Sequence, residues 1–106
     1  MPLDETFAAL ADPTRRAILL RLGRSEATLG ELATGFDITL TGVAKHVRVL
    51  EDAGLVETAK VGRTRVCRLG RTRLDDVTQW IETYRAMLEQ RLDHLEAFLE
   101  RTKEDP

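Results

Sequence analysis

The chain has 106 residues and a mass of 11.9 kDa, the size of a single domain over residues 1–106. Hydrophobic residues make up 42% and charged residues 32%, which is enough apolar material for a core and argues against wholesale disorder. This length excludes a two-domain enzyme with a cleft between lobes, and it makes association with a second copy plausible.

The cysteine count and the apolar runs indicate a compartment. Cys67 is the one cysteine, so no internal disulfide forms and a reducing cytoplasm is expected. The first residues lack the basic and apolar regions of a secretory signal peptide. Because no apolar run approaches about 18 residues, we expect no membrane partner.

Charge is distributed unevenly along the chain. The net charge is −2, made up of −3 over residues 1–12, +5 over residues 13–71 and −4 over residues 72–106. Binding of a polyanion depends on the charge of the local surface rather than on the net charge of the chain. The basic middle segment is therefore compatible with nucleic-acid binding, and the alternative is an ordinary solvated face.

Two helices are predicted first. Residues 4–11 form a short helix, because apolar residues recur at helical spacing. Asp12 and Pro13 are typical of an N-cap and a first helical position. They predict a second helix over residues 13–23, with Gly23 as its stop. The apolar residues of these two helices are Leu3, Phe7, Leu10, Ile18, Leu19 and Leu22.

A pair of short helices follows. Thr28 and Glu31 have the spacing of a capping box, which predicts a third helix over residues 28–35. Thr39 is the N-cap candidate of a fourth helix over residues 40–53, which ends at Gly54. On a helical wheel the buried stripe and the opposite, cationic face are distinct, and one imidazole lies on the flank. The residues are Val43, Val47 and Leu50 in the stripe, Thr41, Lys45 and Arg48 opposite, and His46 on the flank.

The last part of the chain predicts a hairpin and a long helix. Residues 55–69 are rich in β-branched residues around a central glycine, and the tip and second strand carry Lys60, Arg63, Arg65 and Arg68. From residue 72 to about residue 103 apolar residues recur in steps of three and four, which predicts one helix. They are Leu74, Val77, Ile81, Tyr84, Leu88, Leu92, Leu95 and Leu99, widened by Trp80 and Phe98.

This order of elements is mainly α with a small β-hairpin, and it predicts a winged helix-turn-helix (α-α-α-α-β-β-α). The helix-turn-helix spans residues 28–54 and the wing residues 55–69. A major groove about 12 Å wide admits one helix, which needs small or polar residues at its start and cations one turn later. Wing cations would lie along phosphates or in a minor groove. The candidate DNA contacts are Thr39, Thr41, Gly42, Lys45, His46, Arg48, Lys60, Arg63 and Arg65.

Three blocks of the sequence stand out: LADPTRRAIL at residues 10–19, VAKHVRVLEDAGLV at residues 43–56, and Gly62-Arg63 before a strand. Together they resemble the ArsR family of winged-helix bacterial transcriptional regulators. The resemblance covers roughly residues 5–99. It implies a homodimer that binds a palindromic operator in double-stranded DNA, usually as a repressor, with residues 1–11 and 72–103 as dimerisation helices. The interface residues would be Leu3, Phe7, Trp80, Ile81, Tyr84, Leu88, Leu92, Leu95 and Leu99.

The resemblance also locates the positions where relatives bind metals. One family site has two cysteines at the start of the third helix, and Thr28 and Gly30 occupy those positions here. Another site takes aspartates and histidines from the last helix. That stretch contains Asp75, Asp76 and Asp93, but its one histidine is His94. The sequence therefore resembles the branch without metal ligands, whose members often regulate their own operon. It indicates no cofactor and identifies no effector.

Several residues have alternative interpretations. Cys67 is a small half-buried hydrophobe or a redox thiol, although the chain has no second cysteine to resolve it. Trp80 and Tyr84 belong to a dimer core or line a ligand pocket. His46 contacts DNA or packs internally, while Arg15 and Arg16 touch phosphate or form surface pairs.

The function also has alternatives. No phosphate loop, Ser/His/Asp set or carboxylate pair is present, so no enzyme is expected. A winged helix can instead serve as a protein-interaction module. A DNA-binding regulator that responds to a metal or a thiol reagent is the other alternative.

Overall fold

The computed structural model describes residues 2–70 and 74–104. It divides into two compact units, residues 1–75 and residues 76–106. The first two residues of the predicted helix over 72–103 lie outside the described residues.

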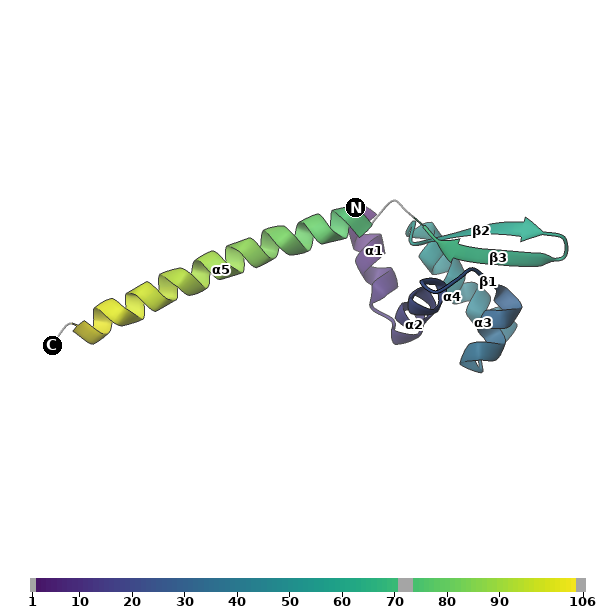
Figure 1. Cartoon of the computed structure of the whole chain (residues 1–106), viewed down its shortest axis with the longest axis horizontal. Helices are drawn as coiled ribbons and strands as arrows, with labels where there is room; N and C mark the ends of the chain where they lie inside the picture. The colour runs from purple at the N-terminus through teal and green to yellow at the C-terminus, as the bar shows by residue number, and fades with distance from the viewer. Residues whose placement is uncertain (1, 71–73, 105–106) are drawn as a thin grey trace. The chain divides into compact units, whose positions relative to one another are not determined.

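The first unit contains four helices and three short strands within its described residues (Figure 1). Each predicted helix is present, with ends that differ by one or two residues where they are described. The wing is present as two paired strands. The elements are α1 (Pro2–Leu10), α2 (Pro13–Leu22), β1 (Ala27–Thr28), α3 (Leu29–Phe36), α4 (Leu40–Asp52), β2 (Val56–Val61) and β3 (Thr64–Leu69). The second unit is formed by α5 (Leu74–Glu104).

Local capping explains where the helices begin. The Asp12 carboxylate accepts a hydrogen bond from the Arg15 backbone N–H at 3.0 Å and starts α2. Thr28 and Glu31 form the predicted capping box at the start of α3. At α4 the Thr39 hydroxyl accepts from the Gly42 N–H at 3.0 Å. These side chains satisfy backbone donors that have no partner within the helix, which is why the predicted starts agree with the structure.

The turn between α3 and α4 has a left-handed residue. Asp37 has φ 53° and ψ 46°, and the Ile38 N–H returns to the Ala33 carbonyl at 3.1 Å. This geometry ends α3 abruptly and allows α4 to begin at Leu40, three residues after Asp37. The helix-turn-helix predicted from the sequence is thereby formed.

The sheet is antiparallel, with the order β1-β3-β2. The register pairs Val56 with Leu69 and Val61 with Thr64, so Gly62 and Arg63 form a two-residue turn. Gly62 has φ 63°, which a glycine adopts without strain. The sequence predicts only the two-stranded hairpin, and the structure adds β1. Two residues are too few to show the alternation that marks a strand.

The core of the first unit is aliphatic and includes the lone cysteine. Cys67 is fully buried, deeper than the half-buried position expected from its strand. Phe36 and Ile38 pack against this core from the turn. The core residues are Ala9, Ile18, Leu22, Ala27, Leu32, Val43, Val47, Leu50, Ala53, Leu55, Val56 and Cys67. No helix among the described residues is both long and apolar enough to cross a bilayer.

Candidate nucleic-acid interface

Helix α4 has one buried face and one exposed face. Val43, Val47 and Leu50 are at most 3% exposed. The exposed face carries Thr41, Lys45 and Arg48, as the helical wheel predicts. A helix that is anchored along one side and polar along the other can enter a groove without losing its own core contacts.

Four cations on α4 and the wing have no hydrogen-bond or ion-pair partner among the described residues. Lys45 and Arg48 on α4, and Lys60 and Arg63 on the wing, are exposed. None of them has an ion-pair partner within residues 2–70 and 74–104. Unpaired cations keep their full charge for an external anion, and this set is the most available for phosphate.

Beside the exposed Leu40, the start of α4 carries three small or polar residues, Thr39, Thr41 and Gly42. The Thr39 hydroxyl is engaged as the N-cap. A β-carbon at Gly42 would lie 3.1 Å from that hydroxyl, so the glycine gives the cap room. Both residues thus shape the first turn of α4, while Thr41 remains an exposed hydroxyl on it.

Two wing arginines are engaged within the protein. Arg68 forms an ion pair with Glu57 at 2.9 Å, directly across the β2–β3 register. Arg65 donates to the Thr58 hydroxyl at 2.8 Å, and Thr58 donates to Glu51 of α4 at 2.5 Å. Arg65 therefore lies over a groove of about 400 Å³ between α4 and the wing, with Arg48 on its other wall. Its charge is partly committed, unlike that of Arg63.

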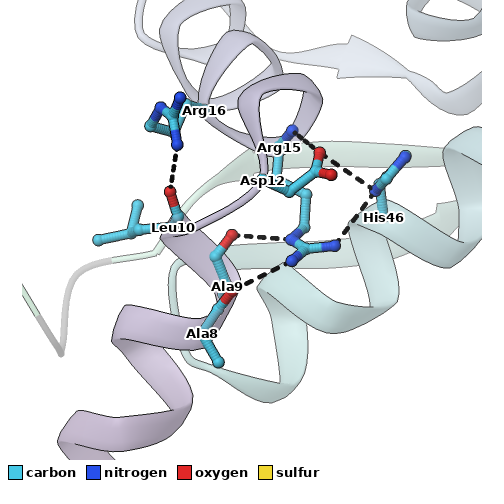
Figure 2. Close-up of polar contacts among 7 residues, drawn as sticks. All are labelled: Ala8, Ala9, Leu10, Asp12, Arg15, Arg16 and His46. Carbon is cyan, nitrogen blue, oxygen red and sulfur yellow. Dashed lines mark hydrogen bonds and ion pairs between the residues drawn. The ribbon is translucent and has the colours of Figure 1, made fainter.

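His46 and Arg15 lie together on the flank of α4 (Figure 2). His46 Nδ1 is 3.5 Å from Arg15 Nη1 and 3.9 Å from Asp12 Oδ2. The other ring nitrogen is on the side away from these two residues in Figure 2. Arg15 also donates to the carbonyls of Ala8 and Ala9 at 3.1 and 2.7 Å. His46 thus has an internal contact on one ring nitrogen, which the sequence pattern alone does not indicate.

Two groups have a shifted pKa with a clear cause. The Arg15 backbone N–H, together with the nearby Arg15 and His46 charges, lowers the pKa of Asp12 from its ordinary value. Burial raises the pKa of the Cys67 thiol, and Glu51 adds to the shift. A buried thiol with a raised pKa is a poor nucleophile, which favours the interpretation of Cys67 as a core residue.

The two positions that the family resemblance matched to a cysteine site have other roles here. Thr28 caps α3, and Gly30 is an exposed helix residue. Within the described part of the chain, no three His, Cys, Asp or Glu side chains are grouped as metal ligands.

Helix α5, taken by itself, has a long apolar stripe. The side chains predicted for the dimer interface on this helix are each between 46% and 55% exposed. The Trp80 and Tyr84 rings stack, with centroids 5.4 Å apart and planes 3° from parallel. On α1, Leu3 and Phe7 are partly buried.

The contact between Arg15 and His46 is the feature that sequence reasoning missed. The two residues are 31 positions apart, and only the packing of α2 on α4 joins them. The signal available in the sequence was the Asp12-Pro13 helix start, which places Arg15 in the first turn of α2.

Comparison with known sequences agrees with this architecture. Residues 10–59 match the model of a family described as a helix-turn-helix domain. The uncharacterized HTH-type transcriptional regulator YuzN of Bacillus subtilis is 44% identical, and the match covers 74% of this chain and 95% of that protein.

Solved structures extend the similarity to the whole fold. One of an ArsR family transcriptional regulator, RHA00566, has a TM-score of 0.78 and 43% identity, covering 84% of this chain and 98% of that one. Another is the homodimeric winged helix-turn-helix DNA-binding domain Mb0332 from Mycobacterium bovis. It has a TM-score of 0.64 and 25% identity, covering 88% of this chain and 83% of that one.

Proposed function

This chain belongs to the ArsR family of winged helix-turn-helix transcriptional regulators, and on that premise we propose that it is a homodimeric repressor of an inverted-repeat operator. The observation that carries the proposal is the set of unpaired, exposed cations on α4 and the wing, Lys45, Arg48, Lys60 and Arg63. The chain as a whole is anionic, so this local surplus is the feature that suits a polyanion.

The proposed mode of binding places α4 in the major groove. Thr41 and the small residue Gly42 let the first turn approach base edges, while Lys45 follows about one turn later and Arg48 about two. The wing flanks the helix, where Lys60 and Arg63 contact phosphates or enter the adjacent minor groove. In this proposal Arg65 contributes through the guanidinium N–H groups that Thr58 does not engage. His46 contributes through the ring nitrogen that does not face Arg15.

Dimerisation is proposed through α1 and α5. An apolar stripe the length of α5 is unfavourable in water, and a second copy would cover it. That the similar Mb0332 domain is homodimeric supports the association of two copies. Two-fold symmetry would then place the two α4 helices about 34 Å apart, which is one turn of DNA. Repression would follow where such a dimer occupies a promoter in the cytoplasm, including that of its own operon.

The test is selection of bound duplexes from a random DNA pool by the purified chain. The proposal predicts recovered sequences with an inverted repeat whose half-sites are about 10 base pairs apart. Sedimentation at micromolar concentration should give a dimer. A pool that yields no enriched sequence, together with weak binding even at low salt, would favour the protein-interaction alternative.

Repression is tested separately with a reporter that carries the recovered operator. Expression should fall when the protein is supplied, and a Lys45→Ala variant should restore it, because α4 loses a cation at the groove. Addition of zinc, arsenite or a thiol oxidant should leave the operator affinity unchanged. A shift with any of these would support the metal- or thiol-responsive alternative.

A further inference from the structure

One side chain joins three helices of the first unit. The guanidinium of Arg15, in the first turn of α2, donates to two carbonyls at the C-terminal end of α1. The same group contacts His46 of α4 at 3.5 Å. Figure 2 shows the fork of the guanidinium directed to both helices. Because a helix end leaves its last carbonyls without partners, these bonds hold α1 as well as α4.

The neighbouring arginine provides a natural comparison. Arg16 donates to the Leu10 carbonyl at 2.8 Å, so it also caps α1. No hydrogen bond or ion pair between Arg16 and α4 is found among the described residues. The two arginines therefore carry the same charge and hold the same helix end, and they differ in the link to α4.

We infer that Arg15 is a positioning residue that fixes α4 relative to α1 and so sets the half-site spacing that the dimer accepts. This inference rests on the proposed function, in which α1 lies at the dimer interface and α4 in the groove. The separation of the two α4 helices then depends on how rigidly each one is held to its own α1. A planar guanidinium that bonds both helices resists their relative movement better than a single flexible ammonium would.

Asp12 supports this arrangement. Its carboxylate accepts the Arg15 backbone N–H at 3.0 Å, which keeps the first turn of α2 in place. It also lies 3.9 Å from His46 Nδ1. Since a guanidinium can only donate, a hydrogen bond between Arg15 and His46 requires Nδ1 to accept; a neutral His46 then carries its proton on Nε2, and that N–H is a donor on the side of the ring away from Arg15.

The experiment compares Arg15→Gln with Arg16→Gln on two duplexes. One is the operator recovered by selection, and the other is the same operator with one base pair inserted between the half-sites. The parent protein should prefer the first by about tenfold or more, since one base pair displaces a half-site along and around the helix. Arg15→Gln should reduce this preference at least about threefold, while Arg16→Gln should keep it within about twofold of the parent. The ratio of two affinities from one sample is insensitive to the fraction of folded protein.

Two further measurements separate positioning from phosphate contact. Arg15→Lys keeps the charge and loses the fork, so it should also relax the spacing preference. The slope of log affinity against log salt should be the same for Arg15→Gln and the parent, because no phosphate contact is removed. A slope smaller by about one unit per protomer would instead make Arg15 a phosphate contact and overturn the inference.

A readout without DNA tests the contact itself. Long-range proton–nitrogen NMR spectra of the parent should show His46 as the Nε2–H tautomer, with an Nδ1 resonance that moves in Arg15→Gln and not in Arg16→Gln. A predominant Nδ1–H tautomer, or equal effects of both variants, would overturn the inference. A recovered operator with an unchanged spacing preference in Arg15→Gln refutes the positioning role alone, whereas failure to recover any operator refutes the proposed function.

Discussion

Replacement of Arg63 by glutamine should reduce the salt dependence of DNA binding. Arg63 is exposed at the tip of the wing and has no partner in the part of the chain that the structure describes, so in the complex its charge would displace counterions from phosphate. Each protomer offers four such cations on α4 and the wing, and a dimer offers twice that number. If all of them contact phosphate, the slope of log affinity against log salt is about −7.

Arg63→Gln removes two contacts per dimer, so the slope should become shallower by about two units. Between 50 and 200 mM salt the parent would then lose about tenfold more affinity than the variant. Fluorescence anisotropy on the selected operator at four or five salt concentrations measures both slopes.

The matched control is Arg68→Gln on β3, the strand that follows the turn carrying Arg63. Arg68 is paired with Glu57 at 2.9 Å, so its removal frees a carboxylate but takes away no available cation. The slope for Arg68→Gln should stay within about half a unit of the parent. Equal slopes for Arg63→Gln and the parent, or equal losses for the two variants, would refute the assignment of Arg63 as a phosphate contact.

Three further predictions concern the stability and reactivity of the first unit. Gly70→Ala should lower the free energy of unfolding in urea by about 1–3 kcal/mol, because its β-carbon would lie 2.5 Å from the Gly54 carbonyl. Gly35→Ala, whose β-carbon meets nothing within 4 Å, should instead stabilise α3 by up to about 1 kcal/mol. The lowered pKa of Asp12 contributes stability above the ordinary value of 3.8, and this contribution is lost as pH falls through the lowered pKa. Asp12→Asn should therefore destabilise the protein at pH 7 more than at pH 2 in thermal melts. Cys67, buried and with a raised pKa, should react with a thiol reagent only as fast as the protein opens, so faster labelling in native buffer would contradict its burial.

Local rules account for most of the first unit. The capping residues Asp12, Thr28 and Thr39 predict where three helices begin, because each satisfies backbone donors a few residues away. The stripe of Val43, Val47 and Leu50 predicts the buried side of α4 for a similar reason, since helical spacing alone places them together.

The sequence by itself determined the order of the helices and the two wing strands, their ends to within about two residues, and the exposed face of α4, because these depend on contacts within about four residues along the chain, whereas β1 came only from the structure. Only the tertiary structure decided which cations remain available. The hairpin pattern places both Arg63 and Arg68 on the wing, and the strand register then places Glu57 beside Arg68, while no ion pair of Arg63 is found within residues 2–70 and 74–104. Packing of α2 on α4 likewise brings Arg15 to His46. Long charged side chains reach many neighbours, so their partners follow from the arrangement of the elements and not from their own position in the chain.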